Sequence, residues 1–173
     1  MNNKKSGGVW VWHIVAVSLL LLDQITKYWV EKMLVLGEAV PITEMFNLVH
    51  RHNKGAAFSF LANAGGWQRY FFISLAIGIS CWLVFAIQRS TARTETLGYS
   101  FILGGALGNL FDRLFRGAVV DFLDIYWKSH HWPAFNVADS CITLGFIGLM
   151  IGLSSSSNIW ETPVRLILFV MIT

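Results

Sequence analysis

Four long apolar runs constrain the fold of this chain more than any other feature of its sequence. A transmembrane helix needs about 20 predominantly apolar residues to cross the roughly 30 Å hydrocarbon core of a bilayer. The chain of 173 residues is 55% hydrophobic and 13% charged, which leaves too little polar surface for an ordinary soluble domain. We therefore predict an α-helical integral membrane protein, a single domain over residues 1–173, with four transmembrane helices at about 9–30, 68–87, 97–115 and 137–157.

The first apolar run imitates a secretory signal peptide, because Lys4 and Lys5 precede it. No small-x-small cleavage site follows, and apolar character resumes after Lys27 with Tyr28, Trp29 and Val30. This continuation favours a retained transmembrane helix over a cleaved signal.

Two long connections, at about 31–67 and 116–136, lie between the predicted spans. With four spans, both connections fall on one side of the membrane, and both termini and the short 88–96 connection fall on the other. Short β-like stretches at 41–50 and 55–61, with the turn-forming sequence RHNKG between them, predict a small sheet on the membrane surface.

Small residues recur at packing intervals in the last two spans. Gly104 and Gly108 are four residues apart, and Gly145, Gly148 and Gly152 follow a similar spacing. Small residues let helix backbones approach closely in lipid, so we expect tight helix packing at these positions.

Polar side chains gather at the ends of the spans that face the two long connections. A carboxylate near lipid is costly, so each one there is a candidate for a functional site. Two carboxylates that share one proton can activate a water molecule, as in aspartic proteases. The converging residues are Asp23, Lys27, Asn53, Asn109, Asp112, Arg113, Asn136 and Asp139, with Asp121 and Asp124 in the second connection.

Simpler structural roles compete for several of these residues. Asp23 and Lys27 are four residues apart and could neutralise each other on one helix face. Asp112 and Arg113 could form a structural ion pair, and the three asparagines could serve in turns or caps. Asp139 is different, because it sits in FNVADS at the mouth of an apolar span, where an idle carboxylate has little reason to lie.

No metal or organic cofactor is predicted. His50, His52, His130 and His131 lie in the connections without an HExxH motif and are most simply surface residues. The two cysteines fall inside apolar runs without the spacing of metal ligands. The net charge of +3 is spread along the chain with no basic run, which argues against a nucleic-acid partner.

Five sequence blocks, taken together, resemble the bacterial lipoprotein signal peptidases (signal peptidase II). In chain order the blocks are DQITK at 23–27, RHNKGAAFS at 51–59, GGALGNLFDR at 104–113, VVDF at 119–122 and FNVADS at 135–140. The resemblance implies an inner-membrane aspartic endopeptidase that removes signal peptides from diacylglyceryl-modified prolipoproteins, cutting before the lipidated cysteine. It also implies four membrane helices with a small periplasmic β-cradle.

The resemblance further implies residue roles and partners. Its catalytic pair corresponds to Asp121 and Asp139, whereas spacing alone leaves Asp124 as a competitor for Asp121. Its partners are the prolipoprotein substrate and membrane lipid. The residues that match the family's supporting positions are Asp23, Lys27, Asn53, Gly55, Asn109, Asp112, Arg113, Asn136 and Ala138.

The distribution of lysine and arginine does not give one consistent orientation of the chain in the membrane. The terminal side carries five of them and the other side seven, but Lys4 and Lys5 flank the first helix, which usually dominates. The resemblance implies cytoplasmic termini and an active site near the periplasmic face. The apolar tail at 161–173 departs from the family pattern, and residues 166–172 are too few to span a bilayer.

Two other classes of function also fit a membrane protein with buried carboxylates. An ion- or proton-coupled transporter would typically carry them near the midplane, on broken helices or internal repeats, and the sequence has no repeat. A non-catalytic assembly factor could use the same polar cluster to bind a partner. Cleavage of a lipidated precursor peptide separates both classes from a peptidase.

Overall fold

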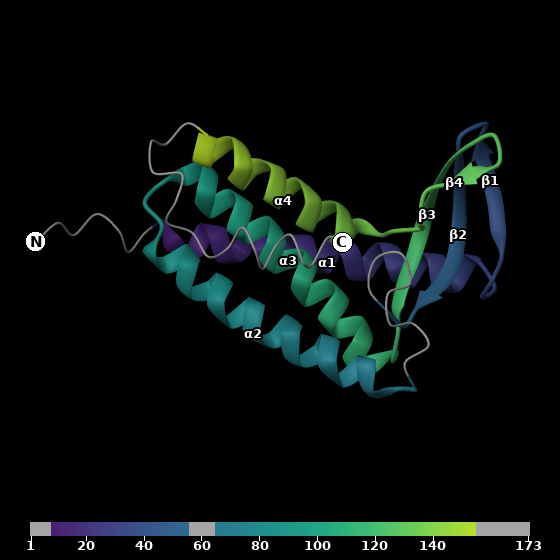
Figure 1. The fold of residues 1–173 in the computed structure, drawn as a ribbon, viewed down its shortest axis with the longest axis horizontal. Helices are drawn as coiled ribbons and strands as arrows, with labels where there is room; N and C mark the ends of the chain where they lie inside the picture. Colours follow the sequence, from purple (N-terminus) through teal and green to yellow (C-terminus); the bar gives the residue numbers. More distant parts are fainter. Residues whose placement is uncertain (1–7, 56–64, 155–173) are drawn as a thin grey trace, which may run out of the picture.

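A computed structural model describes residues 8–55 and 65–154 of the chain. The helices lie side by side, and the strands form a sheet beyond one end of them (Figure 1). The helices are α1 (Val9–Met33), α2 (Trp67–Arg89), α3 (Arg93–Phe115) and α4 (Val137–Ser154). The strands are β1 (Ala39–Thr43), β2 (Phe46–Asn53), β3 (Val119–Trp127) and β4 (His130–His131).

Helix α3 is the centre of the bundle and packs against each of the other three helices. Its glycines make this possible, as the sequence predicted. A Cβ atom on Gly104 would lie 2.8 Å from the backbone oxygen of Ala16, and one on Gly108 would lie 2.6 Å from Oδ2 of Asp23. On α4 the packing expectation is wrong at Gly148, which has no neighbour within 4 Å of such an atom among the described residues.

The outer faces of the helices are strongly apolar. Trp10, Ile14 and Leu21 on α1, and Tyr70 and Phe71 on α2, are exposed. Such a surface suits lipid better than water. Among the described residues, α1 and α2 are the helices long and apolar enough to cross a membrane, while α4 is apolar but shorter. The prediction of four spans therefore remains a prediction.

The sheet is antiparallel, with strand order β1-β2-β3-β4. The predicted turn at 51–55 is wrong in part, because residues 51–53 continue β2 and pair with β3, and the hairpin turns instead at Glu44 and Met45. Pro41 lies on β1, an edge strand, where its missing N–H is tolerated. The second β-like stretch falls mostly on residues 56–64, outside the described part of the chain.

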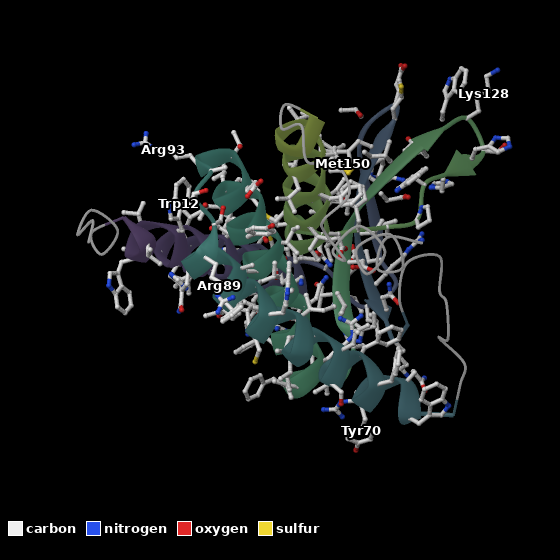
Figure 2. All side chains as sticks on the ribbon, turned by 60° about the vertical axis from the view of Figure 1, so that its left-hand side comes forward. Trp12, Tyr70, Arg89, Arg93, Lys128 and Met150 are labelled. Atoms are coloured by element: carbon white, nitrogen blue, oxygen red, sulfur yellow. The ribbon has the colours of Figure 1, made fainter. Side chains whose placement is uncertain are left out.

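Strand β3 lies in the second long connection, where no strand was predicted. It pairs with β2 across a register irregularity between Leu48 and Arg51, which leaves Arg51 opposite Asp121. Both long connections therefore contribute to one sheet. The short connection lies at the other end of the helices: Figure 2 shows Arg89 and Arg93 far from Lys128 at the tip of the sheet.

Candidate active site

The structure brings Asp121 of β3 and Asp139 of α4 to the same asparagine. The Asn136 Nδ2 donates a hydrogen bond of 2.7 Å to Oδ1 of Asp121. The backbone N–H of Asn136 donates a bond of 3.2 Å to Oδ2 of Asp139. Asn136 is fully buried, so its bonds to the two carboxylates are shielded from water. The two carboxylates that the sequence singled out therefore lie together.

The start of α4 fixes the orientation of Asp139. Asn136 precedes the first residue of the helix, and its Oδ1 accepts a 3.0 Å bond from the backbone N–H of Asp139. Because the Asp139 carboxylate in turn accepts from the Asn136 N–H, the pair forms a reciprocal capping box. A negative charge in the first turn of a helix is also favoured by the helix dipole. The sequence FNVADS thus begins a helix and positions a carboxylate at the same time.

The environment of Asp121 favours its protonated form. Burial raises the pKa of Asp121 to about 7, and the nearby charge of Asp139 adds to the effect. Hydrogen bonds from Asn136 and Asn53 act in the opposite direction but are weaker. A carboxyl group in this range can exchange a proton near neutral pH.

Asn109 connects the dyad to a buried charge. Its Nδ2 donates a 2.8 Å bond to Oδ1 of Asp139, and its Oδ1 accepts a 3.0 Å bond from Nζ of Lys27. The lysine therefore orients the amide that holds Asp139. Because an asparagine amide has one donor side and one acceptor side, this chain of contacts fixes which way Asn109 faces.

Lys27 is completely buried and uses all three of its N–H donors. Besides Asn109, its Nζ contacts Oδ2 of Asp23 at 2.8 Å and Oδ2 of Asp112 at 2.7 Å. Asp23 and Lys27 do form the predicted ion pair, but Lys27 also pairs with Asp112. Two carboxylates from α1 and α3 share one lysine, and that lysine also reaches toward the dyad.

The expected ion pair between Asp112 and Arg113 does not form. Asp112 pairs with Lys27 and, at 2.8 Å, with Arg116, whereas the Arg113 Nη2 donates a 3.0 Å bond to the carbonyl of Gly55. Neighbouring residues on a helix point about 100° apart, since there are 3.6 residues per turn. Arg113 instead faces the dyad, where it lies close enough to both carboxylates to attract them.

The remaining predicted residues close the site. Asn53 hydrogen-bonds Asp121, and its Oδ1 accepts a 3.0 Å bond from the N–H of Gly55, which is buried. The N–H of Ala138 donates a 2.9 Å bond to Oδ1 of Asp23. Ala138 is fully buried, so a larger side chain there would push α4 away from α3.

Asp124 lies in a different environment. It accepts a 2.9 Å bond from Asn47 and 3.0 Å contacts from Nδ1 of His131. Burial tends to raise the pKa of Asp124, but the bonds from Asn47 and His131 outweigh it and lower that pKa overall. Asp124 is therefore satisfied within the sheet, and the structure brings Asp121 to Asp139 instead.

Two residues of this network were missed from the sequence. Gln24 donates a 3.0 Å bond to Oδ1 of Asp112, and Arg116 contacts Asp112, Gln24 and Glu31. Gln24 stands inside the DQITK block, which was a signal for it. Arg116 stood alone at the start of a long connection, and no local pattern marked it.

Both the sequence and the fold match known bacterial proteins. The sequence model of the signal peptidase (SPase) II family matches residues 15–155. A lipoprotein signal peptidase of Aeromonas hydrophila is 53% identical over 148 residues, which are 84% of this chain and 87% of that protein. One from Serratia marcescens is 52% identical over 134 residues, which are 76% and 79% of the two chains. A solved bacterial membrane enzyme, 31% identical, superposes with a TM-score of 0.78 and covers 94% of this chain and 98% of its own.

Proposed function

This chain belongs to the signal peptidase II family, and we propose that it removes signal peptides from prolipoproteins as an aspartic endopeptidase of the bacterial inner membrane. In this proposal Asp121 and Asp139 are the catalytic pair. The substrate is a diacylglyceryl-modified prolipoprotein, cut just before its lipidated cysteine.

The observation that carries the proposal is the contact of both carboxylates with Asn136. Two carboxylates this close do not readily ionise together, so the pair holds one shared proton near neutral pH. The pKa of Asp121, raised by burial to about 7, supports this sharing. An aspartate held only for stability would instead resemble Asp124, with donors that favour its charged form.

The shared proton permits general acid–base hydrolysis. The ionised carboxylate accepts a proton from a water molecule, whose oxygen attacks the scissile carbonyl carbon. The protonated carboxyl hydrogen-bonds the carbonyl oxygen and stabilises the negative charge that develops on it. A proton then passes to the leaving nitrogen as the C–N bond breaks, and the pair returns to its starting state. Asn109 and Asn136 keep both carboxylates oriented throughout.

The position of the pair suits a lipid-anchored substrate. The polar network includes Asp112 in the last turn of α3, Asp139 in the first turn of α4 and Asp121 on β3, and the sheet lies beyond these helix ends (Figure 1). The outer faces of α1 and α2 are apolar. A signal helix could therefore remain in the bilayer while its end reaches the dyad. A midplane site, as expected for the alternative of a transporter, would place these residues near the middle of the helices.

The test is cleavage of a synthetic precursor by the purified protein in detergent. A peptide with a diacylglyceryl-modified cysteine should be cut immediately before that cysteine, as identified by mass spectrometry. The same peptide with an unmodified cysteine should be cut poorly. Absence of cleavage by folded wild-type protein, or equal cleavage by Asp139→Asn, would overturn the proposal.

A further inference from the structure

A second group of titratable side chains lies where the end of α1 meets β2. Glu31 of α1, and His50 and His52 of β2, each place one potential metal ligand atom within 4.8 Å of the others. We call these three residues the α1–β2 group. Glu31 also contacts Arg116 at 3.1 Å, and through it the group adjoins the network that supports the dyad.

His50 is buried, contrary to the expectation of a surface histidine. Its Nδ1 lies 3.0 Å from the carbonyl oxygen of Leu34, and its exposed fraction is 7%. Since a carbonyl oxygen can only accept, the Nδ1 of His50 carries the hydrogen. In a neutral ring, Nε2 is then left with a bare lone pair. Among the described residues, this buried nitrogen has no hydrogen-bond partner.

This is the arrangement found in histidines that bind metals. Such residues donate one ring N–H to a carbonyl or carboxylate, which fixes the tautomer and directs the other nitrogen to the ion. A buried polar atom without a partner is otherwise unfavourable. The orientation of His50 is thus explained if a ligand occupies the space beside Nε2.

His52 and Glu31 supply the other donors. Residues two apart on a strand point to the same side, and the rings of His50 and His52 are 5.3 Å apart. Each oxygen of the Glu31 carboxylate has two lone pairs, so it can accept from Arg116 and still bind a cation. Two imidazoles and one carboxylate suit divalent transition metals, with open positions for water.

The distances require only a small adjustment. Ligand atoms around a tetrahedral Zn²⁺ lie roughly 3.3 Å apart, given bonds of about 2.0–2.1 Å. Because the His52 side chain is exposed, rotation about its side-chain bonds can close the difference. The positive charge of Arg116 beside Glu31 opposes a cation, so the affinity should be moderate rather than very high.

We infer that Glu31, His50 and His52 form a binding site for a divalent transition-metal ion of the Zn²⁺ class. The ion would join the last turns of α1 to β2. It takes no part in the peptidase chemistry, so the inference does not depend on the proposed function.

The experiment measures Zn²⁺ binding to the full chain. Protein purified in detergent with an affinity tag that lacks histidine is treated with a chelator, dialysed, and titrated with Zn²⁺ by calorimetry. Wild-type protein should bind about one ion per chain. His52→Ala and Glu31→Gln should weaken binding at least about tenfold, as should His50→Gln, which retains a donor for the Leu34 carbonyl.

The matched control is His130→Ala, an exposed histidine on β4 outside the group. It should bind Zn²⁺ as wild type does. Zn²⁺ should also raise the thermal midpoint of wild-type and His130→Ala protein but not of His52→Ala, because only a folded site binds the ion. The metal-free midpoint of each variant reports its folding, and His52→Ala decides the matter if His50→Gln is unfolded. Lack of saturable binding by wild type, or unchanged binding in His52→Ala, would overturn the inference.

Discussion

Asp121 and Asp124 lie three residues apart on β3 and are both almost fully buried, yet their surroundings differ sharply. Asp121 accepts from the amides of Asn136 and Asn53 and lies near a second carboxylate, and burial raises its pKa to about 7. Asp124 accepts from Asn47 and His131, and these bonds lower its pKa in spite of burial. Both side chains are covered from solvent, but Asp124 lies nearer the surface, beside the half-exposed His131. Burial therefore raises its pKa less than it raises that of Asp121, and the donors around Asp124 prevail.

The comparison separates a structural carboxylate from a candidate catalytic one. Donors around Asp124 stabilise its charge and hold β3, β4 and β2 together. The donors around Asp121 are neutral amides, and a second carboxylate opposes its ionisation. A buried group held near the middle of its titration, beside a specific charged partner, is a candidate for acid–base chemistry.

The largest effect is expected from the dyad itself. Asp121→Asn and Asp139→Asn each remove the shared proton and should each lower precursor cleavage by about 10³-fold or more. Because the two residues act as one unit, the double variant should be little worse than either single one. Cleavage is measured at matched protein concentrations, with thermal midpoints as the check on folding. Substantial cleavage by folded Asp121→Asn would erase the distinction between the two aspartates of β3.

Lys27 tests how far the environment of the dyad depends on the buried ion network. Lys27→Met leaves Asp23 and Asp112 without their shared cation and removes the shorter of the two contacts of the Asn109 Oδ1, which leaves only a 3.4 Å bond from Asn136. Removing one partner of a buried ion cluster costs about 3–5 kcal/mol, so we expect a marked fall in the thermal midpoint. Cleavage by the fraction that remains folded should fall as well, since Asn109 then holds Asp139 less firmly.

The control for this variant is Lys32→Met, which removes an exposed lysine five residues further along α1. Exposed charges contribute little, so its midpoint and activity should stay near those of wild type. Equal effects of the two substitutions would mean that the contacts of Lys27 are not what stabilises the site.

Sequence alone predicted those features that short segments determine. The helices follow from apolar runs. Asp139 stood out because a carboxylate at the start of such a run is costly near lipid and is therefore a candidate for a functional role. The structure shows a local role for this carboxylate, because Asp139 and Asn136 form a capping box within four residues. The resemblance to a family then separated Asp121 from Asp124, which spacing could not do.

Features that depend on distant pairing could not be predicted. Strand β3 is held by β2, more than 60 residues earlier, and that pairing also turns Asp124 toward Asn47. The partners of Asp112 come from α1 and from Arg116 rather than from its neighbour Arg113. The burial of His50 likewise depends on the packing of the end of α1 against β2, which nothing in the local sequence NLVHRH at 47–52 reveals.

The pH dependence of stability sharpens the comparison. The pKa of Asp121 is about 7 in the folded protein, compared with about 3.9 in an unfolded chain. The folded state therefore binds an extra proton between these values, and the free energy of unfolding should decrease as pH rises from about 4 to about 7 and then level off. Thermal midpoints should accordingly decrease between about pH 5 and pH 8 in wild type, and decrease less in Asp121→Asn. Identical slopes in the two proteins would contradict the raised pKa.

The smallest effect is expected from Asp124→Asn. Because the pKa of Asp124 is lowered in the folded protein, its contribution to stability is present above about pH 4 and is lost as pH falls through the folded value. At neutral pH the substitution replaces charge-assisted bonds to Asn47 and His131 by neutral ones and should cost about 1 kcal/mol. Cleavage should remain close to wild type, since the contacts of Asp124 are with Asn47 and His131 of the sheet. Thermal midpoints and cleavage rates of Asp124→Asn and Asp121→Asn, measured side by side, give the decisive pair of numbers. An inactive Asp124→Asn variant beside an active Asp121→Asn variant would reverse the assignment. The reaction would then require Asp124, the carboxylate whose charge Asn47 and His131 stabilise.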